Sequence, residues 1–189
     1  MSWDGYKTMP IIADMIVFGY NKNKESILEP SEPCLCPECK KGILKIRAHV
    51  RRHYRKEDSG EKIWQEISLG QCDRDECGRM CRILPPYMVP HKHYEEPVIS
   101  KVLDGTITEE TPIGFPSIQT MCYWIAWLNK NLSRMESLLR SIGYQVLGYG
   151  EELLFSTETL VEQLRRDTNQ WLKIIIRAIY NSGYRLLPL

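Results

Sequence analysis

Two stretches decide the fold of this chain: Cys36-Pro37-Glu38-Cys39 and, after residues 40–71, Cys72-Asp73-Arg74-Asp75-Glu76-Cys77. Each is a short turn that directs two thiolates at one point, and a β-hairpin between them would bring the two pairs together. Four thiolates surround Zn²⁺ tetrahedrally at about 2.3 Å per bond. The sequence therefore predicts a structural zinc site with ligands Cys36, Cys39, Cys72 and Cys77, holding a β-unit too small to build much core.

The second pair is the looser signal, because four residues rather than two separate its cysteines. Other donors near the two pairs keep the ligand set open: Cys34 for Cys36, Cys81 for Cys72 or Cys77, and His49 and His53. A redox pair is a weaker interpretation, since no βαβ pattern surrounds the CxxC motif. A site closed by four cysteines leaves no position for a reacting water, so an enzyme is not expected.

The composition places limits on the class of protein. The chain has 189 residues, 43% hydrophobic and 26% charged, which is typical of one ordinary or two small globular domains. No apolar run approaches the ~20 residues of a membrane span, and no signal peptide precedes the seven cysteines. We therefore expect a cytoplasmic protein without a disulfide framework or membrane contact. The net charge of +1 excludes a uniformly basic protein.

The residue pattern predicts an α+β protein, with a small zinc-ribbon β-hairpin unit followed by an all-helical domain. Residues 10–20 read as one strand and residues 21–33 as a linker. Alternation of apolar and polar residues predicts strands over 44–51 and 63–69, joined by a turn at 56–62, and a short third strand at 81–84. The predicted divisions are an N-terminal strand and linker (1–33), a zinc ribbon (34–93) and a helical domain (94–189).

Helical periodicity begins at about residue 95. A first helix is expected over 95–103, and a second over 117–130 with Ser117 as its cap and Cys122 on its packed side. These two form the predicted helix-turn-helix over 95–132. The pattern Ser133-x-x-Glu136 predicts the start of a third helix. The last and longest helix is expected over 157–181, capped by Ser156 or Thr157.

Positive charge is concentrated in one segment. Residues 40–56 contain eight lysines and arginines and no acidic residue. On one strand Lys45, Arg47, His49 and Arg51 would share a face at ~6.7 Å spacing, close to that of successive phosphates. The alternative is a solvated strand face neutralised by acidic residues of the turn and returning strand (Glu57, Asp58, Glu61 and Glu66).

These features predict contact with double-stranded DNA. The basic strand would bind phosphates, a second cluster near residues 79–93 would add charge, and the first turns of the 117–130 helix would read a groove. The candidate contacts are Lys45, Arg47, Arg51, Arg52, Arg55, Arg79, Arg82, Lys92, Gln119, Thr120, Tyr123 and Lys130. The rival prediction is a protein-interaction adaptor, with a protein partner or a homodimer held through the C-terminal helix.

Residues 34–130 also carry a resemblance. It rests on Cys36-Pro37-Glu38-Cys39, on the segment from Cys77-Gly78-Arg79 through Leu84-Pro85-Pro86 to Tyr94, and on the Ser117-x-x-Thr120 helix. This arrangement resembles uncharacterised bacterial proteins related to the N-terminal regions of insertion-sequence transposases, in which a helix-turn-helix follows a zinc ribbon. The chain departs from them in its longer second knuckle and at Cys81, where they tend to have histidine. The resemblance implies DNA binding linked to mobile elements, as an accessory factor or small regulator, without catalysis.

Overall fold

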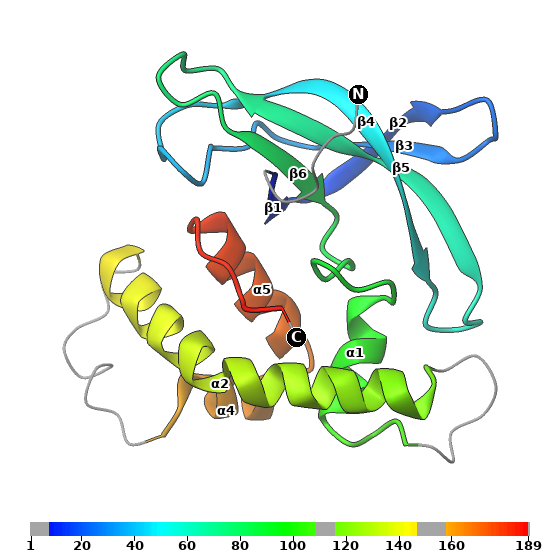
Figure 1. Ribbon diagram of the computed structural model, residues 1–189, viewed down its shortest axis with the longest axis vertical. Coiled ribbons are helices and arrows are strands. Elements are labelled where there is room, and N and C mark those ends of the chain that lie inside the picture. Colours follow the sequence, from blue (N-terminus) through cyan, green and yellow to red (C-terminus); the bar gives the residue numbers. More distant parts are fainter. Residues whose placement is uncertain (1–7, 109–115, 147–157, 189) are drawn as a thin grey trace.

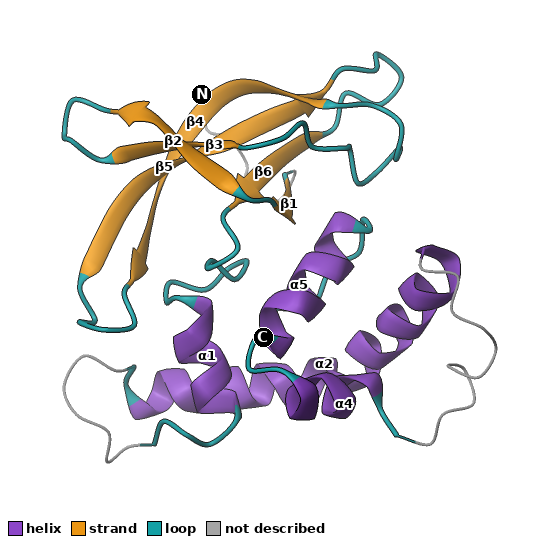
Figure 2. Cartoon of the chain, turned by 180° about the vertical axis from the view of Figure 1, so that it is seen from behind, coloured by secondary structure: helices purple, strands orange, loops and turns teal. Residues whose placement is uncertain are grey.

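The computed structural model describes residues 8–108, 116–146 and 158–188, with the side chains of the second segment described as far as Tyr144 (Figure 1). Within these residues six strands form one sheet, and four helices form a layer beside it (Figures 1 and 2). The expected α+β class is therefore confirmed. No helix among these residues is long and apolar enough to span a bilayer.

The sheet is organised around β5. The strands are β1 (Met9–Ile12), β2 (Met15–Tyr20), β3 (Ser26–Pro30), β4 (Leu44–Arg55), β5 (Lys62–Cys72) and β6 (Met80–Leu84). One edge of β5 pairs antiparallel with β4 along nearly its whole length. Its other edge is shared, because residues 65–67 pair parallel with β3 and residues 69–71 pair antiparallel with β6. The outer strands follow, with β2 antiparallel to β3 and β1 parallel to β6.

The predicted hairpin and third strand are confirmed as β4, β5 and β6. The prediction of one strand over residues 10–20 is wrong, because the chain changes its partner at Ala13 and Asp14. The amide of Ala13 donates to the Leu84 carbonyl beside β6, whereas the carbonyl of Asp14 accepts from the Ser31 amide beside β3. A mostly apolar segment thus forms two strands at opposite ends of the strand order.

The helices are α1 (Glu96–Leu103), α2 (Ile118–Val146), α4 (Leu160–Asp167) and α5 (Trp171–Asn181). The predicted first helix is confirmed as α1, with Pro97 in its first turn. The predicted break before Ser133 is wrong, since α2 runs through it. A buried stripe that includes Trp127 and Met135 crosses this point without interruption. Glu136 does not cap its own helix but accepts a hydrogen bond from the Val161 amide at the start of α4.

The predicted single helix over 157–181 is also wrong, because it is two helices. Thr168 is extended, and its hydroxyl accepts from the Gln170 amide, an arrangement that ends one helix and begins the next. The first of the two, α4, is capped by Thr159, whose hydroxyl accepts from the Glu162 amide. The predicted caps at residues 156 and 157 lie outside the described residues.

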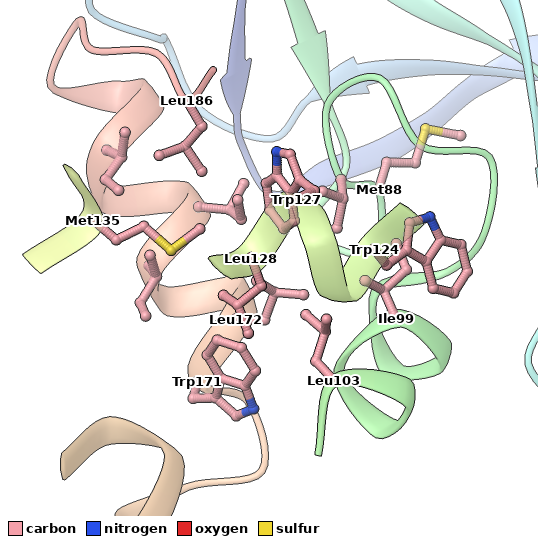
Figure 3. Packing of buried hydrophobic residues seen from close by; sticks show 14 of the residues in the cluster. Met88, Ile99, Leu103, Trp124, Trp127, Leu128, Met135, Trp171, Leu172 and Leu186 are labelled. Atoms are coloured by element: carbon pink, nitrogen blue, oxygen red, sulfur yellow. The ribbon is translucent and has the colours of Figure 1, made fainter. Parts of the chain in front are cut away.

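Apolar side chains form a core on each face of the sheet. The larger core joins the helices to one face, through residues such as Ile12, Ile67 and Leu84. Figure 3 shows its centre, where side chains of α2 (Trp124, Trp127 and Leu128) gather with side chains of α1 and α5 (Ile99, Leu103, Trp171 and Leu172). The smaller core contains Met9, Ile11, Leu44 and Ile83, with Cys36, Cys72 and Cys81. The cysteine turns therefore cover the face opposite the helices.

Two asparagine side chains tie the last segment to the rest of the chain. Asn181 pairs with both the amide and the carbonyl of Ile12, as a neighbouring strand would. Asn131, which is fully buried in α2, pairs in the same way with Leu187. The predicted boundaries at residues 33 and 93 stay predictions, although the sheet combines strands from both sides of residue 33.

The buried Glu96 generates a prediction about stability. Desolvation raises the pKa of Glu96 to about 7, and its Oε1 atom has no hydrogen-bond partner among the described residues. The folded state thus retains a proton that the unfolded chain releases near pH 4.5. This contribution to stability is present below that pH and is lost as pH rises through about 7. We expect Glu96→Gln to remove this loss and to stabilise the protein at pH 8 by up to about 3 kcal/mol.

Thermal unfolding of the wild type and Glu96→Gln between pH 5 and pH 8 measures this effect. The exposed Glu61→Gln variant serves as the matched control for loss of a carboxyl group. A constant difference between Glu96→Gln and the wild type across this range would contradict the assignment.

Candidate metal centre and basic surface

The four predicted cysteine ligands meet in the folded chain. Their Sγ atoms all lie within 4.8 Å of one another, and two separations, Cys36 to Cys77 and Cys39 to Cys72, are 3.7 Å. Four thiolates at 2.3 Å from one ion form a tetrahedron with edges of about 3.8 Å. The arrangement therefore fits a tetrahedral thiolate metal site, formed by one pair of ligands from each cysteine turn.

Backbone hydrogen bonds position the two turns against each other. In the first turn the Cys36 amide donates to the Gly42 carbonyl, which folds the chain back on itself. In the second turn Asp73 holds Ile43 twice, through an amide-to-carbonyl bond and through its Oδ1 atom, which accepts from the Ile43 amide at 2.9 Å. Sequence reasoning missed Asp73, although an aspartate directly after a ligand is a common backbone-bonding residue in turns.

Gly42 permits the close approach of the second turn. A Cβ atom at this position would lie 2.4 Å from the Cys72 Sγ, far inside van der Waals contact. The Gly42 amide also points at the Cys39 Sγ, 3.4 Å away. This amide and that of Lys41 lower the pKa of Cys39 to about 6, so the thiolate forms at neutral pH.

Two of the other ligands, Cys36 and Cys72, ionise less readily than a free thiol. Desolvation raises the pKa of Cys36 and raises that of Cys72 to about 12. Burial and the neighbouring Cys39 thiolate both disfavour ionisation of these two thiols, whereas a divalent ion at the centre of the four sulfurs favours the ionised form of each. The chemistry of the donor set thus agrees with its geometry.

The alternative donors lie outside this cluster of four sulfurs. Cys34 contacts the Glu32 carbonyl, and Cys81 is buried within β6. His49 pairs with Glu29 at 3.1 Å, and the ring of His53 stacks on that of His93 at 4.4 Å.

The expectation that Cys122 packs in the core is wrong, because this side chain is exposed. The buried side of α2 passes instead through Met121 and Trp124. The helix is amphipathic, as predicted, but the apolar Cys122 lies on its outer side.

Loss of a single ligand tests the metal centre. We expect the wild type to bind about one metal ion per chain and Cys77→Ser to lose it, because three thiolates cannot close a structural tetrahedron. Cys34→Ser is the matched control and should retain the metal. Metal content after dialysis is measured by inductively coupled plasma mass spectrometry, and unchanged content in Cys77→Ser would refute this ligand set.

The role of Gly42 gives a separate prediction. We expect Gly42→Ala to weaken metal affinity by about 10–100-fold, since its methyl group must displace the Cys72 sulfur and disturb the amide that supports Cys39. Gly19→Ala, where no atom lies within 4 Å of the new methyl group, is the control. Competition with a chromophoric chelator measures both affinities. Equal affinities would show that the first turn tolerates a side chain.

The predicted continuous basic stripe is interrupted by a β-bulge. The register of β4 against β5 shifts between Ile46 and Ala48, so Arg47 is the extra residue. Since cross-strand partners share a face, Lys45 lies on the opposite face of the sheet from His49 and Arg51. The prediction that these four residues share one face is therefore wrong.

Several predicted DNA contacts are held within the chain. Arg51 pairs with Glu25, and Arg79 pairs with Glu38. The half-buried Arg52 donates to the Val89 and Lys92 carbonyls, and desolvation lowers its pKa to about 10. Elsewhere Arg47 donates to Gln71, Arg55 to the Gly60 carbonyl, Lys130 to the Pro188 carbonyl, and Lys92 lies over Trp127.

The remaining candidates differ in exposure. Arg82 is partly buried, with its Nε atom unpartnered among the described residues. Lys45 is exposed on β4, and Gln119, Thr120 and Tyr123 lie in the first turns of α2. The carboxylates that pair with Arg51 and His49 come from Glu25 and Glu29 rather than from the returning strand.

Aromatic rings connect α2 to the end of the β4–β5 hairpin that lies away from the cysteine turns. On the outer face of β5, Trp64 lies beneath Arg51 at 3.9 Å and Lys62 at 4.5 Å. Arg55 lies 6.0 Å from the ring of Tyr94, which in turn meets Trp124 of α2 edge-on at 5.2 Å. Both views show the hairpin turn at the same end of the molecule as the start of α2 (Figures 1 and 2).

Comparison with known families gives one match. A model for a domain of unknown function (DUF6431) matches residues 36–124, a little under half of the chain. The match begins at Cys36 and ends at Trp124 of α2. No curated protein and no solved structure matches the chain. The matched segment joins the metal centre, the β4–β5 hairpin and the start of α2, the same parts that the aromatic contacts connect.

Proposed function

We propose that this chain is a zinc-dependent DNA-binding protein that acts by binding rather than by catalysis. Zn²⁺ is the ion that best suits four thiolates in a tetrahedron, and a site with four protein ligands has a structural role. When bound, the ion would stabilise the junction of β4, β5 and the two cysteine turns. A role in mobile elements rests on the sequence resemblance alone.

The observation that carries the proposal is the continuous set of contacts from Arg55 through Tyr94 to Trp124. These contacts fix the cationic end of the hairpin relative to the first turns of α2, where Gln119 and Tyr123 are exposed. Binding to duplex DNA needs such a pairing, in which cations position the phosphate backbone and a helix presents polar side chains to the bases.

The cations at this end remain available for phosphates. Among the described residues Arg55 and Lys62 form no ion pair, and both side chains are exposed. Arg51 is paired with Glu25 but is also about half exposed. We therefore assign phosphate contact to Arg51, Arg55 and Lys62, which lie together at this end of the hairpin.

A protein-interaction adaptor remains the second candidate. One observation favours it, namely the exposed apolar edge of the sheet at β2. A homodimer through the C-terminal helix stays a prediction, and α5 buries six side chains within the chain's own core: Trp171, Leu172, Ile175, Ile176, Ile179 and Tyr180.

Fluorescence anisotropy with labelled duplex DNA across a salt series tests DNA binding. We expect the Arg55→Ala/Lys62→Ala double variant to bind more weakly at every duplex sequence. Removing two phosphate contacts should reduce the slope of log K against log salt by about 1.8. Lys41→Ala/Arg185→Ala removes the same charge at exposed positions outside the proposed surface, and should leave the slope unchanged.

Single-stranded DNA and RNA probes of equal length establish which nucleic acid is preferred. A zinc-loaded wild type that binds no duplex at low salt would refute the proposal. The adaptor hypothesis would then be the one to pursue.

A further inference from the structure

The outer edge of β2 is exposed and unpaired within the described part of the chain. It is the last strand in the sheet order, with β3 on its inner side. Ile16 and Val17 are each 53% exposed, Phe18 66% and Tyr20 70%, so a continuous apolar segment faces solvent. Figures 1 and 2 show β2 and β3 extending beyond the helical layer, away from the cover that the helices give the rest of the sheet.

Natural proteins usually protect such an edge. Charged residues, proline, short strands and bulges are the common devices, because free amides and carbonyls on an apolar edge recruit another strand. Residues 15–20 contain no charge and no proline. The bulge at Phe18 is the one device present among these residues, and it leaves the apolar side chains on either side exposed. The edge therefore has the properties of a site for strand addition.

The charges that flank β2 identify the strand that fits. Asp14 precedes the apolar segment and Lys22 follows it. In an antiparallel pair of two copies of β2 centred on Phe18, the end of the strand that carries Asp14 in one copy meets the end that carries Lys22 in the other, whereas a parallel pair would place like charges together. Asp14 is 64% exposed even though it also pairs with Arg177, so it remains accessible to a second cation.

We propose that β2 is a dimerisation strand that pairs antiparallel with β2 of a second copy of this chain. The two sheets then form one continuous sheet, with apolar residues opposite apolar residues and an Asp14–Lys22 pair at each end. This inference rests on the exposed edge and its flanking charges and is independent of DNA binding.

Sedimentation velocity of the zinc-loaded chain from about 5 to about 200 µM tests the dimer, a range suited to micromolar association. We expect dimers in the wild type and a loss of at least about tenfold in association for Ile16→Lys, since a lysine on the edge blocks strand addition. Ile118→Lys is the matched control, because Ile118 lies on the exposed side of α2 with almost the same exposure, 54%. It should dimerise like the wild type.

Charge reversal provides a test that does not depend on an apolar substitution. Asp14→Lys and Lys22→Glu should each weaken self-association, because each creates two repulsive pairs. An equimolar mixture of the two variants should restore dimers, since both end pairs are then attractive. Thermal unfolding of each variant verifies that it is folded.

Three results would overturn the proposal. The first is a wild type that is monomeric at the highest concentration. The second is a dimer that Ile118→Lys abolishes and Ile16→Lys retains, which would place the contact on α2. The third is a mixture of charge-reversed variants that associates no better than either variant alone.

Discussion

The structure depends on the meeting of two cysteine turns at the end of the β4–β5 hairpin. The pairing of Leu44 with Cys72 places the end of β5 beside the start of β4, and the ligand turns extend from these two points. A bound ion would fix both ends of the hairpin and thereby its register. Because β5 pairs with β3, β4 and β6, its position determines where β3 and β6 attach. Only the outer strands β1 and β2 do not pair with it. Without a cation, the small core around Cys36, Cys72 and Cys81 would have to hold the same arrangement by itself.

Local patterns in the sequence predicted the elements that depend on local rules. The alternation of Leu44, Ile46 and the following residues predicted β4, and the two closely spaced cysteine pairs predicted which four sulfurs meet. The predictions that were wrong depend on tertiary structure. The Ser133-x-x-Glu136 pattern satisfies the rule for a helix start, but the gain from a continuous buried stripe along α2 exceeds that of a cap. Nothing in the local pattern shows that Arg47 would be extra in its strand, since a bulge depends on the partner strand.

The partners of the basic residues on β4 also depend on tertiary structure. A run of basic residues on a strand predicts a phosphate-binding face only if no acidic group lies opposite it. Here β3 brings Glu29 to His49, and Glu25, just before this strand, pairs with Arg51. Neither glutamate could be assigned as a partner from the sequence, because they lie 20 and 26 residues away from the residues with which they pair. Much of the basic charge is thus balanced by pairing within the chain, whereas Arg55 and Lys62 are exposed and form no ion pair among the described residues.

The two proposed surfaces are related by the geometry of the sheet. An antiparallel β2 pair within one continuous sheet has its two-fold axis perpendicular to that sheet, so the hairpins of both copies face the same way, and so do their helical layers. From β4 of one copy to β4 of the other the strand order is β4, β5, β3, β2, then the same strands reversed, which makes seven inter-strand steps. At about 4.8 Å per step the two β4 strands lie about 34 Å apart before the twist of the sheet is counted. That separation is one turn of B-DNA, the spacing at which two-fold symmetric proteins bind successive half-sites. A dimer through β2 would therefore place two cationic hairpins on one side of a duplex, and a palindromic site is the DNA that such an arrangement would favour.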